Sequence, residues 1–151
     1  MTIWVDADAC PRDVRDVLCN AAVRRQVTIV FVANSYLSLP RSPYIQSIQV
    51  EKGFDVADNK IVQSCEANDL VITGDIPLAA EVLESCPSAS VINPYGQEYD
   101  LANIRQRLAM RDLMQSLRDD YGVQTTGKPR YANKQLKAFS DALDRYLTKH
   151  K

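Results

Sequence analysis

The sequence predicts an α/β protein: a three-layer α/β/α domain with a central, mostly parallel sheet of about five strands and two C-terminal helices. Strand and helix signals alternate over residues 1–100, and such alternation is typical of parallel strands joined by crossover helices. Beyond residue 100 only helical patterns follow. With 151 residues and 46% hydrophobic content, the chain has the size and composition of one globular domain, which we expect residues 1–151 to form.

Five β-rich segments mark the expected strands. The first, at 2–7, ends in acidic residues, and the second, at 27–33, is a continuous apolar run of the kind that a parallel sheet buries on both faces. The remaining three strands are expected at 45–50, 69–75 and 90–92.

Helical patterns connect and follow these strands. Pro11 and Pro77 suit the first turn of a helix, and apolar residues recur at helical spacing after each of them. A further helix is expected at 58–68, and two longer ones near 101–120 and 133–148. We expect seven apolar residues of the last two helices to face the core: Leu108, Leu113, Leu117, Leu136, Phe139, Leu143 and Leu147.

The composition restricts the chemistry. The chain has one histidine, His150, next to its last residue, and terminal residues are usually mobile. Serine–histidine triads and zinc sites built on several histidines are therefore nearly excluded. The four cysteines contain no C-x-x-C pair and no secretory signal precedes them, so we expect reduced thiols and a cytoplasmic protein. No apolar run approaches the length of a membrane span.

The net charge of −1 conceals two unlike segments. Residues 1–100 carry 7 Lys and Arg against 14 Asp and Glu, whereas residues 101–151 carry 11 against 5. The difference is −7 for the first segment and +6 for the second. The two surfaces could simply attract one another within the fold. The functional alternative is a cation site in the first segment and a polyanion-binding surface in the second.

Acidic residues lie where parallel sheets form their sites. Asp6 and Asp8 follow the first strand, Asp75 follows the fourth, and Asp55 and Asp58 precede or begin a helix. Each of them alone would be read as a helix cap or a turn residue. Ligands bind beyond the carboxyl ends of parallel strands, so these carboxylates could meet there. A hard divalent cation such as Mg²⁺ or Mn²⁺ would relieve their mutual repulsion.

Two known patterns fit such carboxylates. A phosphatase of the haloacid dehalogenase type begins with a strand ending in D-x-D, which Asp6 and Asp8 provide, and Thr73 would serve its second motif. Its later pair of strand-end acids is missing from this sequence. The PIN-like nuclease fold instead needs acids at the ends of its first and fourth strands and on the helix between them. Asp6, Asp75 and Asp58 satisfy that order.

Longer motifs make one resemblance specific. They are WVDADACP (4–11), FVAN (31–34), GFDVADNKIV (53–62), VITGDIPLA (71–79), VINPYG (91–96) and TGKP (126–129). The sequence resembles the YaiI/YqxD family of bacterial proteins, which is classed as PIN-like, and the match spans nearly the whole chain. The resemblance implies a PIN-like fold and a metal-dependent ribonuclease, with Asp6, Asp8, Asp58 and Asp75 as both metal ligands and catalytic residues. Asp55 ranks lower, as a ligand or a neighbour of one.

Five further residues are expected to contact the substrate. Asn34 ends the second strand at the same edge of the sheet and could orient a water or a phosphate; Thr73 could do so or could bond a carboxylate from below. Arg111, Lys128 and Arg130 belong to the basic segment, which would suit the backbone of single-stranded or structured RNA. Two other functions stay open: a non-catalytic RNA- or protein-binding module, and a small-molecule phosphatase. The oligomeric state is not predicted.

Overall fold

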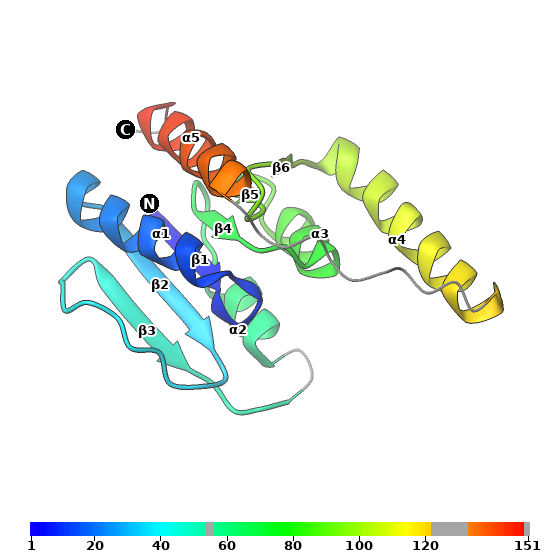
Figure 1. The fold of residues 1–151 in the computed structure, drawn as a ribbon, viewed down its shortest axis with the longest axis horizontal. Helices are drawn as coiled ribbons and strands as arrows, with labels where there is room; N and C mark the ends of the chain where they lie inside the picture. Colours follow the sequence, from blue (N-terminus) through cyan, green and yellow to red (C-terminus); the bar gives the residue numbers. More distant parts are fainter. Residues whose placement is uncertain (54–55, 122–132, 150–151) are drawn as a thin grey trace.

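A six-stranded sheet forms the centre of the computed structural model (Figure 1). The structure describes residues 1–53, 56–121 and 133–149, except for the side chains of 115 and 117–121. The strand order is β3-β2-β1-β4-β5-β6, and every neighbouring pair is parallel except β5 and β6. The strands are β1 (Thr2–Asp6), β2 (Thr28–Ala33), β3 (Ile45–Gln49), β4 (Leu70–Ile72), β5 (Ser90–Ile92) and β6 (Glu98–Tyr99).

The mostly parallel sheet confirms the predicted fold class, and β6 is the one strand that was not expected. It pairs antiparallel with β5, with Val91 opposite Tyr99 and Ile92 opposite Glu98. A tight turn joins the two strands, in which the Gly96 N–H donates to the Asn93 carbonyl at 3.0 Å. A strand of two residues is too short to show the alternating pattern that identifies strands in a sequence.

Helices cover both faces of the sheet and complete the three layers (Figure 1). One face packs against α1 and α5, and the other against α2, α3 and α4. A short 3-10 turn, η1, follows β1 directly. The helical elements are η1 (Ala7–Ala9), α1 (Arg12–Arg25), α2 (Val56–Ser64), α3 (Ile76–Ser85), α4 (Leu101–Tyr121) and α5 (Asn133–Lys149).

Strand β2 shows why the continuous apolar run at 27–33 was informative. Successive side chains of a strand point to opposite faces, so both sets must be apolar where both faces are covered. Ile29 and Phe31 lie in the core beneath α1 and α5, and Val30 and Val32 lie in the core beneath α2, α3 and α4. The strand is thereby held in the interior of the sheet, next to β1.

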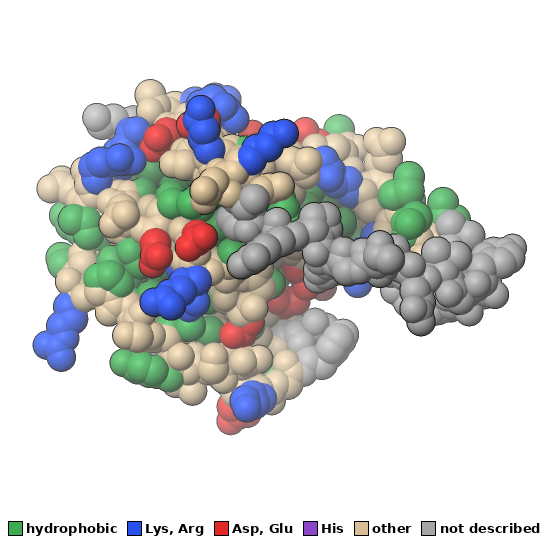
Figure 2. Space-filling view, viewed as in Figure 1, with side chains coloured by type: hydrophobic (Ala, Val, Ile, Leu, Met, Phe, Trp, Pro, Cys, Tyr) green, Lys and Arg blue, Asp and Glu red, His purple; other side chains and the backbone are tan. Residues whose placement is uncertain are grey.

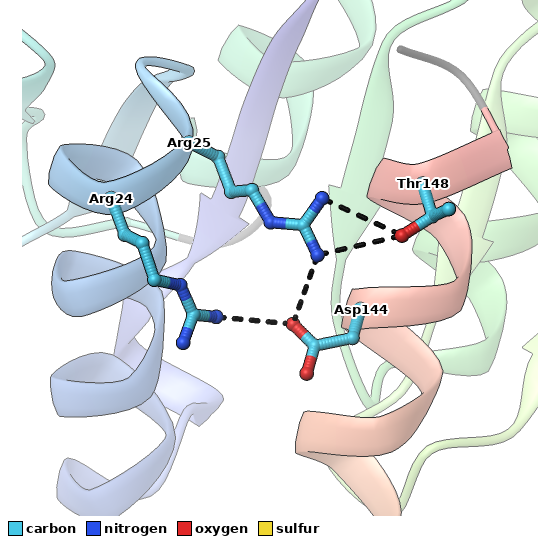
Figure 3. Close-up of polar contacts among 4 residues, drawn as sticks. All are labelled: Arg24, Arg25, Asp144 and Thr148. Atoms are coloured by element: carbon cyan, nitrogen blue, oxygen red, sulfur yellow. Dashed lines mark hydrogen bonds and ion pairs between the residues drawn. The ribbon is translucent and has the colours of Figure 1, made fainter.

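Helix α5 closes the first of these cores by packing beside α1. Figure 3 shows the polar contacts between the two helices: Arg24 Nη2 donates to Asp144 Oδ1 at 3.1 Å, and Arg25 reaches Thr148 Oγ1 at 3.4 and 3.5 Å. Such partly exposed ion pairs contribute little. The attachment of α5 rests instead on apolar burial, to which Phe139, Leu143 and Leu147 contribute.

Helix α4 departs from the prediction for its second half. Ile104 is buried against the sheet, and Leu108 is half-buried. Leu113, expected in the core, has 54% of its surface exposed, and Met110 and Met114 are exposed beside it. Figure 1 shows that α4 leads away from the sheet, and in the described part of the chain neither core contains an α4 residue beyond Leu108. Of the predicted core residues of α5, Phe139, Leu143 and Leu147 are buried, and Leu136 is half-buried against the same core. The side chain of Leu117, also predicted in the core, lies outside the described part of the structure.

The four cysteines are free thiols. Burial raises the pKa of Cys10 and that of Cys65 to about 12 in each case. Both thiols are therefore protonated at neutral pH, and a protonated thiol is a poor nucleophile. Among the described helices, none combines the length and the apolar character that crossing a membrane requires.

Candidate metal centre

The order of the strands creates a crevice at one edge of the sheet. From the central strand β1 the chain builds β2 and β3 on one side, then crosses to place β4 on the other side of β1. Such a reversal leaves a crevice beyond the carboxyl ends of the two strands, and ligands bind there in open α/β sheets. Asp6 is the last residue of β1, and Asp75 follows β4 before α3 begins.

Three carboxylates converge at this crevice. Asp6, Asp58 and Asp75 each place one carboxylate oxygen so that all three atoms lie within 4.8 Å of one another. They come from three elements: the end of β1, the first turn of α2 and the residue that caps α3. Asp6 is 6% exposed and the other two are half-buried. The structure thus brings together three of the four predicted ligands.

Asp75 owes its position to the start of α3. Its Oδ1 accepts the Leu78 backbone N–H at 3.2 Å, as the capping residue of a helix commonly does. Proline in the first turn, here Pro77, favours a helix start at this point. One carboxylate oxygen suffices for the cap, so capping and a role in the acidic cluster are compatible.

Thr73 connects two of the three aspartates. Its hydroxyl donates to Asp6 Oδ2 at 3.0 Å and accepts the Asp75 backbone N–H at 3.0 Å. The residue is 1% exposed, so its hydroxyl lies beneath the carboxylates and not in contact with the solvent. The structure therefore gives Thr73 a positioning role, which is the bond to a carboxylate from below that the sequence suggested, and its contact with a substrate stays a prediction.

The cluster carries an electrostatic cost that a cation would remove. Burial raises the pKa of Asp6 above its usual value, the Thr73 bond lowers it, and the nearby Asp75 and Asp8 raise it further. Carboxylate oxygens are the ligands that Mg²⁺ and Mn²⁺ prefer, and three of them at this spacing fit one such ion with positions left for other ligands.

The carboxylates face a hollow of about 260 Å³ that opens to the surface. Asp8 and Asn34 both line it, and the Asn34 backbone N–H donates to Asp8 Oδ2 at 2.8 Å. This bond ties Asp8 to the end of β2, and Asp8 is not one of the three converging groups. Glu51 also lines the hollow. Sequence analysis missed it, although an acid directly beyond the expected strand at 45–50 was an available signal.

The basic residues are distributed unevenly around this site. Arg111 lines a second hollow, which also contains Asp75. Figure 2 shows several Lys and Arg side chains along the edge of the molecule that carries α5. Lys128 and Arg130, predicted to contact RNA, lie outside the described residues, as does Asp55. Arg107 is engaged elsewhere: its guanidinium lies 5.2 Å from the centre of the Tyr99 ring.

Comparison with known proteins identifies the relatives of this chain. A family model described as "Uncharacterized BCR, YaiI/YqxD family" matches residues 4–149. The chain belongs to the YaiI/YqxD family. This confirms the resemblance seen in the motifs, and the three converging aspartates lie within the matched residues.

Individual members of the YaiI/YqxD family match over their whole length. The chain is 49% identical to a UPF0178 protein of Cellvibrio japonicus, covering 100% of this chain and 99% of the relative. It is 52% identical to a UPF0178 protein of Aliivibrio salmonicida, covering 100% and 98%. It is 50% identical to the UPF0178 protein YaiI of Escherichia coli, covering 99% and 96%. No solved structure matches the chain.

Proposed function

We propose that this YaiI/YqxD-family protein is a PIN-like nuclease that hydrolyses phosphodiester bonds of RNA with Mg²⁺ or Mn²⁺. The observation that carries the proposal is the meeting of Asp6, Asp58 and Asp75 within 4.8 Å at the switch point of the sheet. Their order along the chain and their elements match the arrangement expected of a PIN-like nuclease. The free thiols are in keeping with a cytoplasmic protein.

The residues of the site would have different roles in binding a cation. Asp6, Asp58 and Asp75 would supply the ligand oxygens, and a divalent cation, when bound, supplies positive charge that stabilises a phosphodiester group under attack. The Thr73 hydroxyl favours the ionised form of Asp6, which is the form that ligates. Asp8 and Glu51 border the hollow and are placed to accept hydrogen bonds from water in it.

Cleavage of a labelled RNA in the presence of Mn²⁺ tests the proposal. Three single variants, Asp6→Asn, Asp58→Asn and Asp75→Asn, each remove one charged ligand with little change of shape, and we expect each to abolish the cleavage. Asp13→Asn is the matched control, because Asp13 is exposed on α1 and does not line the hollow. Undiminished Mn²⁺-dependent cleavage by the Asp6→Asn variant would refute the assignment.

The same samples separate the two alternative functions. Hydrolysis of a phosphate monoester, with RNA left intact, would favour the small-molecule phosphatase. Binding of RNA without metal-dependent cleavage would favour the non-catalytic module. Circular dichroism of each variant confirms that the fold is retained before activities are compared.

A further inference from the structure

A second hollow adjoins the acidic one and shares two residues with it. Ala9 and Asp75 line both, so the two hollows lie next to one another at the carboxyl edge of the sheet. The second hollow has a volume of about 370 Å³ and is bounded by the end of η1, the start of α3, the turn after β5 and the middle of α4. A chain molecule held at the three carboxylates can therefore continue into it.

One wall of the second hollow is an exposed aromatic ring on an anchored turn. Tyr95 is 46% exposed, although it follows the buried Asn93 by only two residues. The Asn93 side chain fixes the turn: its Oδ1 accepts the backbone N–H of Tyr95 at 2.9 Å and that of Gln97 at 3.0 Å. Its Nδ2 also donates to the Tyr99 hydroxyl at 3.0 Å. The turn thus presents the ring in a defined place without burying it.

The lining of the second hollow also includes a positively charged group. Arg111 is exposed on α4, and its Nη1 lies 3.9 Å from Oδ1 of the adjacent Asp112, a long contact between exposed groups that contributes little. A guanidinium has five donors in a planar fork that matches the oxygens of a phosphate. Arg111 therefore places a phosphate-binding group in the hollow that begins at Asp75.

Three further lining residues of the second hollow are small or apolar: Gly74, Ile76 and Pro94. Gly74 has no side chain, and a Cβ at this position would lie 3.6 Å from Pro94 Cδ, at ordinary contact distance. Apolar groups, an aromatic ring and a cationic side chain in one hollow are the features that bind an unpaired nucleotide, whose base stacks and whose phosphate carries the charge.

We propose that the second hollow binds one nucleotide of single-stranded RNA next to the phosphodiester that a cation at the carboxylates would hold, with the base stacked on Tyr95 and its phosphate paired with Arg111. The inference rests on the proposed function, because it specifies the substrate of the same site. It limits that substrate to unpaired RNA. A base within a duplex stays stacked on its neighbours and cannot reach the ring of Tyr95.

Equilibrium binding tests the subsite apart from cleavage. Fluorescence anisotropy of a short, labelled single-stranded RNA is measured with the Asp6→Asn variant in EDTA, so that no strand is cut. We expect Tyr95→Ala to weaken binding by about tenfold, since stacking on an aromatic ring has about this effect per base. Tyr95→Phe retains the ring and should bind nearly as well as the parent.

A matched control and a charge variant complete the set. Tyr36→Ala removes a ring that is 82% exposed in a different hollow, beside α1, and should leave the affinity unchanged. Arg111→Gln should weaken binding and also lower its dependence on salt concentration, because one phosphate contact is lost. The same RNA annealed to its complement should bind at least about tenfold more weakly than the single strand.

The outcomes distinguish this inference from the proposed function. Equal loss of affinity in the Tyr95→Ala and Tyr36→Ala variants, equal affinity for duplex and single strand, or no binding of the parent would each overturn the subsite. If binding depends on Tyr95 while the wild-type protein never cleaves RNA with Mn²⁺, the subsite stands and the nuclease proposal fails. If cleavage occurs but Tyr95→Ala binds and cleaves as the wild type does, the reverse holds.

Discussion

Replacing Thr73 with valine measures how much the Thr73 hydroxyl contributes to the stability of the acidic cluster. Valine has nearly the shape of threonine but no hydroxyl, so the change removes the donor to Asp6 Oδ2 and the acceptor of the Asp75 N–H together. A hydrogen bond to a charged group contributes about 1.5–3 kcal/mol, and a backbone N–H left without a partner in a partly buried place costs at least about 1 kcal/mol. The expected loss of unfolding free energy is therefore about 3 kcal/mol.

Thr73→Ser is the matched control, because serine keeps the hydroxyl and loses one methyl group. Its expected cost is about 1 kcal/mol. Both variants are unfolded with urea at neutral pH in EDTA. Their free energies of unfolding are compared with that of the wild type, provided that the dependence of each on urea concentration has the same slope. A valine variant within about 0.5 kcal/mol of the serine variant would refute the view that the hydroxyl supports the cluster.

A double-mutant comparison assigns the effect to Asp6. In an Asp6→Asn background the group at position 6 is neutral, so loss of the Thr73 hydroxyl removes a weaker bond. The valine substitution should then cost about 1 kcal/mol less than it does in the wild-type background. Equal costs in the two backgrounds would place the effect of Thr73 elsewhere than in its bond to Asp6.

Three further predictions concern the site and the fold. At a concentration of 100 times its dissociation constant, Mn²⁺ should add about 2.7 kcal/mol to the free energy of unfolding of the wild-type protein. Calorimetry should therefore show a higher unfolding temperature with Mn²⁺ for the wild type and no such rise for Asp58→Asn. Burial raises the pKa of Asp6, so the folded protein binds a proton at this carboxylate more tightly than the unfolded chain does. Protonation of Asp6 therefore stabilises the fold at low pH, and this contribution to the free energy of unfolding is lost as the pH rises through the raised pKa. In EDTA at neutral pH, Asp6→Asn should accordingly unfold at a higher urea concentration than the wild type, and an unchanged midpoint would contradict this sign. Gly96→Ala should cost at least about 2 kcal/mol in urea, because Gly96 has φ +85° and a Cβ there would lie 2.5 Å from the Ala138 carbonyl oxygen; Gly74→Ala, with its nearest contact at 3.6 Å, is the control.

Those parts of the fold that depend on burial could be predicted from the sequence. The run at 27–33 indicated a strand covered on both faces, and β2 contributes Phe31 to one core and Val32 to the other. Leu113 shows where the same reasoning fails. Helical spacing indicates which residues share a face, but it does not say how far the neighbouring layer extends, and α4 continues beyond that layer.

The acidic cluster could be predicted as far as strand ends determine position. Asp6 and Asp75 follow adjacent parallel strands, so their convergence follows from the order of the strands. The role of Thr73 could not be predicted from the sequence, because a hydroxyl that follows a strand can face either the solvent or neighbouring side chains. Tyr95 was not singled out either, since only the folded turn shows that its ring lines a hollow containing Asp75.

The position of Asp6 in the sheet has a mechanical consequence for the cluster. Asp6 ends a central strand and pairs in register with Val32, so its backbone is as stiff as the sheet itself. Asp58 lies on α2 and Asp75 caps α3; the two helices lie on one face of the sheet and contribute buried side chains such as Ile61 and Leu83 to the same core. The distances from the Asp6 carboxylate oxygen to those of Asp58 and Asp75 therefore depend on how closely α2 and α3 pack against the sheet and against each other. A change of volume at Ile61, three residues after Asp58 on α2, would therefore alter the spacing of the three carboxylates, and with it the ionic radius that they accept, without replacing any of them.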